Sequence, residues 1–406
     1  MSIISFFLGK DIKIKISILL ISTLFALYLV EGYLVINNLH PENNPWKTRE
    51  RIKVSKKLGI EFDDRSKYQV YQDLKKKDPN TVLLKGTRSE IYINGQKIYN
   101  FGGISNRKTI LCNENGYYSI YQSDRYGFNN PDTEWDKNEI EFLLVGDSFV
   151  HGYCVNEPDT IGGNLRSKLN NKKVGVINLG IAGFGPLGEY ATLREYMNLI
   201  NTKRVIWVYY GANDIIDFNT EKNNKILLNY FNNKKFTQNL HLKQKIIDEI
   251  LIESLSIYEK KYKSRFFKLY NLRVLTFGRW KNLLFNMLSY KISPTPLPSF
   301  QFEELFSKSK KFVESKSAKL YFVYLPDLLG EPYSMNKNTK FQHYQKVIQI
   351  IKDLNIPIID LHVEFFEKQK DLLSFYPFRL PGGHFTESGY EQVANIIFNK
   401  IKEFEK

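Results

Sequence analysis

The sequence predicts an α/β protein whose main domain is built on a parallel β-sheet. From Glu139 onward, short apolar runs alternate with segments of helical periodicity, which is typical of successive βαβ units. The apolar runs are nearly continuous, as expected for strands that helices cover on both faces of a sheet. The chain has 406 residues, of which 43% are apolar, so it can bury a sizeable core.

Residues 1–37 predict a membrane anchor. Residues 16–30 are apolar or small and carry no charge, and a second apolar run follows at 33–36. The whole stretch approaches the roughly 20 residues that cross a bilayer. Lys10, Lys13 and Lys15 precede it and favour a cytoplasmic N-terminus. A cleaved signal peptide is the alternative. Because no clean cleavage site follows the run, we expect a single-pass anchor with the C-terminal part outside the cytoplasm.

Residues 38–138 predict a stalk followed by an accessory region. Residues 38–60 are polar and contain Pro41 and Pro45, whereas residues 61–138 are irregular and rich in strand signals. The strongest is residues 91–93 followed by Asn94-Gly95, which is a hairpin signal. The aromatic, Asn and Gly residues of 102–129 fit either a sugar-binding groove or a layer that packs on the main domain.

Residues 139–406 predict the main domain. Strands are expected at 140–145, 173–179, 204–210, 319–325 and 356–361, with helices at 187–200 and along the apolar stripe of 390–401. Residues 220–315 interrupt this alternation as a mainly helical insertion. The insertion fits a lid, a substrate wall, a membrane-surface element or extra packing.

Polar motifs follow the predicted strands. In α/β sheets, ligands bind beyond the carboxyl ends of the strands. Gly-Asp-Ser follows the first strand, Asn-Leu-Gly the second and Gly-Ala-Asn-Asp the third, and Gly-Gly-His lies near the C-terminus. The side chains and backbone expected at one rim are therefore those of Ser148, Gly180, Asn213 and His384.

These residue types suit acyl transfer. Ser148 becomes a nucleophile if a base takes its proton, and His384 is the base whose ordinary pKa suits neutral pH. The oxyanion of a tetrahedral intermediate needs donors aimed at it. The N–H groups of Ser148 and Gly180 and the side-chain amide of Asn213 supply three candidates.

The combination resembles the SGNH (GDSL-type) hydrolases, a family of esterases and lipases, over residues 140–401 apart from the insertion. The resemblance implies a flavodoxin-like three-layer α/β/α fold. It further implies Ser148 as nucleophile, His384 as base and Gly180 and Asn213 as oxyanion donors, with no cofactor or metal. With the expected location, it predicts a serine esterase acting on O-acyl or O-acetyl groups, on a surface glycan or another acylated molecule. An O-acyltransferase and a non-catalytic glycan-binding or assembly protein are the alternatives.

One position departs from the family pattern. An Asp usually stands three residues before the His, but here that position is Pro381. Three explanations stay open. The site works as a Ser148–His384 dyad with a backbone carbonyl orienting the ring, a carboxylate such as Asp360 or Asp327 takes the role, or the domain is catalytically weakened.

The cysteine content bears on the cellular compartment of the protein. Cys112 and Cys154 are the two cysteines, and in an exported domain they can pair as a disulfide. Two unrelated buried thiols are the alternative.

The net charge of +15 raises the question of a nucleic-acid or anionic-surface partner. Because the charge is spread along the chain and comes mainly from Lys, we interpret it as a solvated surface and expect no nucleic-acid partner.

Overall fold

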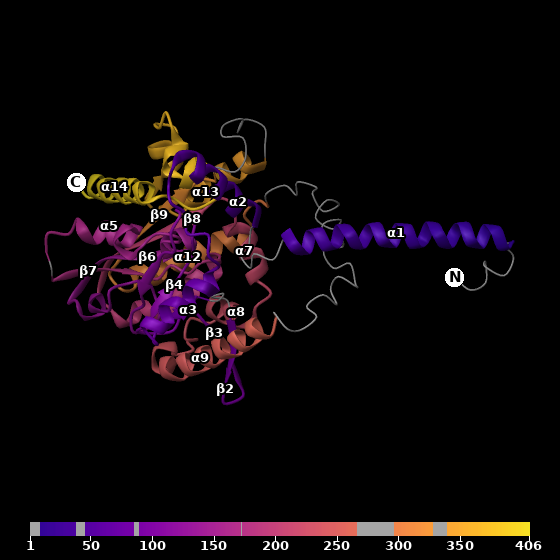
Figure 1. Ribbon diagram of the computed structural model, residues 1–406. Coiled ribbons are helices and arrows are strands. Elements are labelled where there is room, and N and C mark those ends of the chain that lie inside the picture. The colour runs from indigo at the N-terminus through magenta and orange to yellow at the C-terminus, as the bar shows by residue number, and fades with distance from the viewer. Residues whose placement is uncertain (1–8, 38–44, 85–88, 172, 266–295, 328–338) are drawn as a thin grey trace. The chain divides into compact units, whose positions relative to one another are not determined.

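The computed structural model describes residues 9–37, 45–84, 89–171, 173–265, 296–327 and 339–406 (Figure 1). The chain forms two compact units. One comprises Met1–Pro45 and Ser256–Ser293, and the other comprises Trp46–Leu255 and Pro294–Lys406. The expected stalk residues 38–44 and the insertion residues 266–295 lie outside the described residues.

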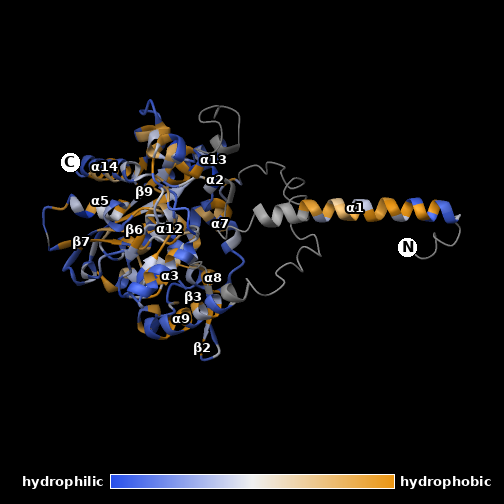
Figure 2. Cartoon of the chain, viewed as in Figure 1, coloured by the Kyte–Doolittle hydropathy of each residue, from blue (hydrophilic) through white to orange (hydrophobic). Residues whose placement is uncertain are grey.

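The first unit contains helix α1 (Lys10–Asn37), which is apolar over much of its length (Figure 2). Its segment Lys10–Val30 is long and apolar enough to cross a membrane, a property that a signal sequence shares. Large apolar side chains such as those of Leu19 and Phe25 are exposed. The hydroxyls of Ser22 and Thr23 donate to carbonyl oxygens one turn earlier, which satisfies both groups inside the helix.

The second unit is built around a sheet of five parallel strands in the order β10-β9-β8-β6-β7. Read from β7, this is the flavodoxin-like order, and the fold is the predicted three-layer α/β/α sandwich. The strand predictions are confirmed with small shifts at the ends. The observed bounds are β6 Glu139–Gly146, β7 Val174–Asn178, β8 Thr202–Tyr210, β9 Lys319–Leu325 and β10 Ile358–Asp360.

Alternation along the strands produces two cores, one on each face of the sheet. Val145 and Trp207 belong to one core, and their neighbours Leu144 and Ile206 belong to the other. The first core is closed by α6 (Pro186–Tyr196), α7 (Asp214–Glu221), α12 (Phe300–Glu314) and α13 (Thr339–Asp353). The second is closed by α5 (Ile161–Ser167) and α14 (Glu387–Phe404), whose buried residues include the predicted stripe. Both faces are therefore covered, as the continuous apolar strands predict.

Within the insertion, the described residues are mainly helical, as expected. They form α8 (Lys225–Asn232), the long helix α9 (Leu240–Arg265) and α12. Leu227, Leu240 and Phe302 are fully buried in the first core. The part of the insertion that lies in the second unit therefore contributes to packing.

Residues 46–138 belong to the same compact unit as the sheet. They form helices α2 (Pro45–Leu58) and α3 (Lys67–Lys77) and the short strands β1 (Val82–Leu83), β4 (Lys108–Ile110) and β5 (Ile120–Gln122). The predicted hairpin is confirmed as β2 (Ser89–Ile93) and β3 (Gln96–Asn100). Its turn residues Asn94 and Gly95 both have positive φ angles, as a type I′ turn requires.

Hydrogen bonds from residues 129 and 130 tie this region to the loops at the end of the sheet. Asn129 Nδ2 donates to the carbonyl of His151, which follows β6. Asn130 donates to the carbonyl of Asn178 at the end of β7 and accepts from its N–H. Because all four residues are buried, these bonds fix the two loops that carry the predicted site.

Candidate active site

Ser148 begins the short helix α4 (Ser148–His151), just after strand β6, which lies between β8 and β7 in the sheet. Asp147 is the N-cap of this helix and accepts a hydrogen bond from the N–H of Phe149 at 3.0 Å. The chain turns sharply here, since β6 ends at Gly146 and the helix starts two residues later. The serine is therefore presented at the carboxyl end of the sheet and is not fully buried.

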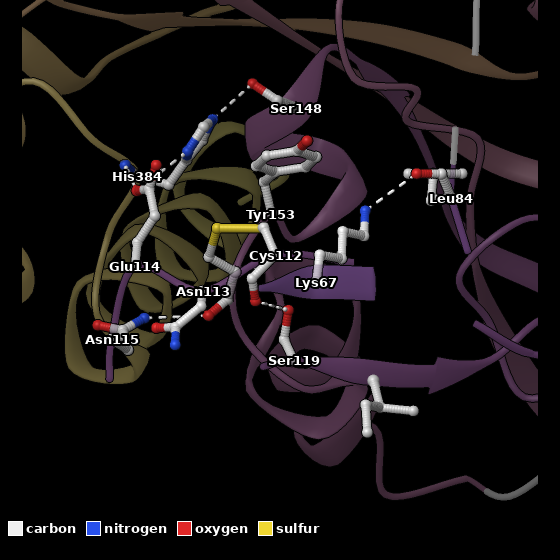
Figure 3. The surroundings of a disulfide bond; sticks show 12 residues. Lys67, Leu84, Cys112, Asn113, Glu114, Asn115, Ser119, Ser148, Tyr153 and His384 are labelled. Atoms are coloured by element: carbon white, nitrogen blue, oxygen red, sulfur yellow. Dashed lines mark hydrogen bonds and ion pairs between the residues drawn. A yellow bond between two sulfur atoms is a disulfide. The ribbon is translucent and has the colours of Figure 1, made fainter. Parts of the chain in front are cut away.

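His384 lies on the loop before α14 and contacts the serine. Its Nε2 is 2.8 Å from Ser148 Oγ, a hydrogen-bond distance (Figure 3). The imidazole packs between two aromatic rings, with centroid distances of 4.9 Å to Phe149 and 4.8 Å to Tyr153. The structure thus brings together the two residues that the sequence assigns as nucleophile and base.

The other ring nitrogen of the imidazole, Nδ1, contacts Glu114, a residue that the sequence did not single out. Glu114 Oε2 lies 3.3 Å from His384 Nδ1 and accepts a 2.7 Å hydrogen bond from the His384 N–H. A carboxylate at Nδ1 holds the ring proton there, so that Nε2 presents its lone pair to the serine hydroxyl. Ser148, His384 and Glu114 therefore have the geometry of a catalytic triad.

Electrostatics favour the ionised form of Glu114. Burial by itself would raise the pKa of this carboxyl, but the charge and hydrogen bonds of His384 and the charge of Arg51 lower it to about 2. Arg51 Nη2 lies 3.3 Å from Glu114 Oε2. Glu114 is therefore an anion at neutral pH, as the partner of an imidazolium must be.

The two aspartates considered for this role, Asp360 and Asp327, contact other side chains. Asp360 accepts a 2.5 Å hydrogen bond from the Tyr344 hydroxyl and another from the His362 N–H. Asp327 lies 3.4 Å from the Tyr210 hydroxyl. The position beside His384 is occupied by the Glu114 carboxylate instead.

A disulfide joins the Glu114 segment to the chain that follows the nucleophile. Cys112 and Cys154 form this bond, as the sequence analysis considered for an exported domain (Figure 3). Glu114, Cys154 and His384 each have an atom that could bind a metal ion, and these three atoms lie within 4.8 Å of one another. The Cys154 sulfur is already bonded to Cys112, so this cluster does not offer a thiolate to a metal. The disulfide instead holds the segment that contains Glu114 near the imidazole.

The oxyanion donors differ from the sequence-based expectation at Gly180. Its N–H donates to Asn178 Oδ1 at 2.7 Å, closing an Asx turn, so this donor is already used. A Cβ at Gly180 would lie 2.4 Å from the backbone nitrogen of His151. Glycine is therefore required here for close packing against α4, not for approach of a ligand.

Gly183 offers the alternative N–H in the same loop. It has a φ of 84°, is partly exposed, and its N–H makes no hydrogen bond within the described part of the chain. Sequence reasoning missed it because Gly180 and Gly183 are equivalent until the turn is known. The Asx-turn pattern, Asn followed two residues later by Gly, is the signal that distinguishes them.

Asn213 follows β8, the strand beside β6, and is the N-cap position of α7. One hydrogen of its Nδ2 goes to Asp217 Oδ2 at 2.7 Å. The amide nitrogen carries two hydrogens, so a second one is left for a ligand. The carbonyl oxygen of the same side chain is buried without a partner among the described residues.

His151 lies three residues after Ser148 and is 3% exposed. Its Nδ1 accepts a hydrogen bond from the Ala182 N–H at 3.3 Å. Burial, with smaller contributions from the charges of His384 and Lys67, lowers its pKa to about 3. His151 is thus a neutral structural link between the nucleophile helix and the loop that contains Gly183.

No family model and no curated protein matches the chain. Solved structures similar to it include a lipase/acylhydrolase from Enterococcus faecalis, at 13% identity and a TM-score of 0.37, covering 66% of this chain and 96% of that one. A psychrotrophic esterase from a Pseudoalteromonas species is similar at 13% identity and a TM-score of 0.33, covering 66% and 98%. An acetylxylan esterase from Geobacillus stearothermophilus is similar at 13% identity and a TM-score of 0.36, covering 65% and 94%. The chemistry of the site therefore has to follow from its own geometry.

Proposed function

We propose that this protein is a serine esterase that cleaves O-acyl esters through a covalent acyl-enzyme. The observation that carries the proposal is the 2.8 Å contact between Ser148 Oγ and His384 Nε2, with the Glu114 carboxylate on the opposite ring nitrogen. A serine hydroxyl with a base in hydrogen-bond contact, and an anion behind the base, is the arrangement that activates an otherwise weak nucleophile.

In the first half-reaction, Ser148 Oγ attacks the carbonyl carbon of the ester while His384 Nε2 takes its proton. The carbonyl oxygen becomes an oxyanion, which accepts hydrogen bonds from the N–H groups of Ser148 and Gly183 and from the second amide hydrogen of Asn213. The intermediate collapses, the alcohol leaves with the proton from His384, and the acyl group stays on Ser148. Glu114 stabilises the imidazolium in both steps.

In the second half-reaction, water attacks the acyl-enzyme, and His384 takes one of its protons. Collapse releases the carboxylic acid and returns the proton to Ser148. If a glycan hydroxyl attacks in place of water, the acyl group passes to the glycan and the protein acts as an acyltransferase. The two outcomes share all of the residues named above, so the acceptor has to be determined by experiment.

The substrate that we propose is an acylated glycan, or another acylated molecule, outside the cytoplasm. Support for the location comes from α1, whose exposed apolar segment is followed in the chain by all of the site residues. The disulfide in the second unit is also favoured by an oxidising compartment. A short acyl group such as acetyl is the form of substrate that we would test first.

The experiment compares release of acetate from p-nitrophenyl acetate and from an acetylated xylan by the full chain in detergent. Ser148→Ala and His384→Ala should each abolish turnover while leaving the fold intact by circular dichroism. Adding a deacetylated oligosaccharide distinguishes hydrolysis from transfer, because a transferase would produce an acetylated oligosaccharide instead of acetate. A folded wild-type protein without turnover on either substrate would contradict the proposal and favour a glycan-binding role.

A further inference from the structure

Glu114 is held by a buried arginine from a helix outside the α/β core. We propose that Arg51 is a positioning residue of the catalytic site, which acts through Glu114 on the His384 imidazole. This inference rests on the proposed function, because it assigns Arg51 a part in the same acyl transfer. The link is direct: Arg51 Nη2 is 3.3 Å from the oxygen atom of Glu114 that faces His384.

The burial pattern of α2 is unusual for a packing helix. Its fully buried residues in the described part are Arg51 and Ser55, which are 6% and 1% exposed. The apolar residues of its described part, from Thr48 on, are less covered, since Ile52 and Val54 are only partly buried and Leu58 is 55% exposed. A helix that docks for hydrophobic reasons buries its apolar stripe instead. The buried face of α2 is therefore organised around the arginine.

A buried guanidinium is costly unless a charge pairs with it. The Arg51 side chain is 7% exposed and the Glu114 side chain 17%. Removing the arginine would leave the carboxylate with His384 as its nearest charge partner. Since the same oxygen contacts both residues, loss of Arg51 frees the carboxylate to rotate away from Nδ1. The imidazole then loses the group that fixes its tautomer and direction.

Gly383 provides the space for this pair. A Cβ at that position would lie 2.5 Å from Arg51 Nη2 and 2.6 Å from Glu114 Oε2. Any side chain there would displace one of the two groups. The Gly-Gly-His sequence therefore accommodates the ion pair directly beside His384.

The end of α2 supports a fixed position for Arg51. Gly59 has a φ of 66°, its N–H donates to the Lys56 carbonyl, and the Ile60 N–H donates to the Ser55 carbonyl. This is a Schellman motif, which terminates the helix at a defined residue. The turn of helix that carries Arg51 and Ser55 is thereby anchored on its C-terminal side.

The test is a double-mutant cycle on kcat, measured with p-nitrophenyl acetate and the full chain in detergent. Arg51→Gln should lower kcat about 10- to 100-fold, the range found when the outer partners of metal-binding histidines are removed. Arg51→Lys, which keeps the charge, should recover part of the loss. Lys53→Gln, an exposed change two residues along the same helix, is the matched control and should leave kcat unchanged.

The cycle separates positioning from a general loss of structure. In a Glu114→Gln background, Arg51→Gln should cause no further loss of kcat, because its effect passes through the missing carboxylate. The inference is overturned if Arg51→Gln retains wild-type kcat, or if its effect is the same with and without Glu114.

A second readout does not depend on turnover. In the 15N-histidine-labelled full chain, the Nδ1–H resonance of His384 is assigned by its loss in His384→Gln. It should be lost through faster exchange in Arg51→Gln and persist in Lys53→Gln. An unchanged resonance in Arg51→Gln would overturn the inference even in a protein without esterase activity. Absence of turnover in the wild type would count against the proposed function alone.

Discussion

His384 Nδ1 lies 3.3 Å from Oε2 of Glu114, a residue 270 positions earlier in the chain. The acid of this site therefore comes from outside the α/β sheet, whereas the nucleophile and the base come from loops at its carboxyl end. Two connections hold the acid in place. One is the Arg51 ion pair, and the other is the disulfide formed by Cys112, two residues before Glu114.

Replacing the carboxylate of Glu114 should impair chemistry more than binding. We expect Glu114→Gln to lower kcat about 10³- to 10⁴-fold, because an amide does not stabilise the imidazolium and does not fix its tautomer. KM should change little. Glu61→Gln, an exposed change in the same region of the chain, is the control. A Glu114→Gln enzyme with near wild-type kcat would mean that Ser148 and His384 act as a dyad.

The sheet was predictable because its strands are buried on both faces. The expected fourth strand, 319–325, coincides with β9, since every residue after Lys319 in that strand is buried and apolar. The fifth is shorter than expected because only Ile358–Asp360 pair with β9. Pro357, which has no N–H to donate, precedes this pairing. Strand ends thus depend on pairing partners that the local sequence does not specify.

Site residues that lie in short motifs of the α/β domain could be predicted, whereas the one that comes from the region before the sheet could not. Ser148 and His384 belong to short motifs, whereas Glu114 is one acidic residue in an irregular segment. The cysteines offered the available signal, because a Cys112–Cys154 disulfide places residue 114 close to the chain that follows Ser148. The assignment of Gly180 as an oxyanion donor failed for a local reason, since its N–H already donates to the Asn178 side chain.

Reducing the disulfide should weaken both stability and activity. It closes a loop with a sequence separation of 42, for which loop-closure entropy gives a stabilisation of about 4 kcal/mol. We therefore expect the double variant Cys112→Ser/Cys154→Ser to unfold at lower denaturant concentration. Its kcat at a temperature where it is folded should also fall, as Glu114 loses one of its supports. Equal kcat in the folded variant and the wild type would show that the disulfide is not needed to position Glu114.

Removing the Asn213 amide should slow acylation. Loss of one oxyanion donor typically costs about 10²- to 10³-fold in kcat, and we expect this range for Asn213→Ala. Asn224→Ala is a matched control, because Asn224 caps α8 and its loss should reduce stability by about 1 kcal/mol without affecting kcat. If both variants kept wild-type kcat, Asn213 would not be an oxyanion donor, and its hydrogen bond to Asp217 would be its only role in the site.

His151 should make the fold sensitive to acid. Its pKa is about 3 in the folded protein and 6.5 in the unfolded chain, so between these values the unfolded state binds more protons and stability falls as pH falls. Between pH 7 and pH 5 this amounts to about 2 kcal/mol. Asp124, whose pKa burial raises to about 6, acts in the opposite direction.

A comparison with His151→Gln isolates the histidine from these other groups. The free energy of unfolding of the wild type should fall by about 2 kcal/mol more than that of the variant when the pH changes from 7 to 5. Denaturant unfolding at the two pH values measures this difference. Parallel pH dependences would show that His151 does not remain neutral in the folded protein.

The most direct test of an active Ser148–His384 pair is covalent labelling of the full chain with a fluorophosphonate, followed by mass spectrometry of the modified peptide. The wild type should be modified at Ser148, Ser148→Ala should not be modified, and His384→Ala should react far more slowly. A folded wild-type protein that is not modified, or is modified at a different serine, would contradict the assignment of this site as a serine nucleophile with a histidine base.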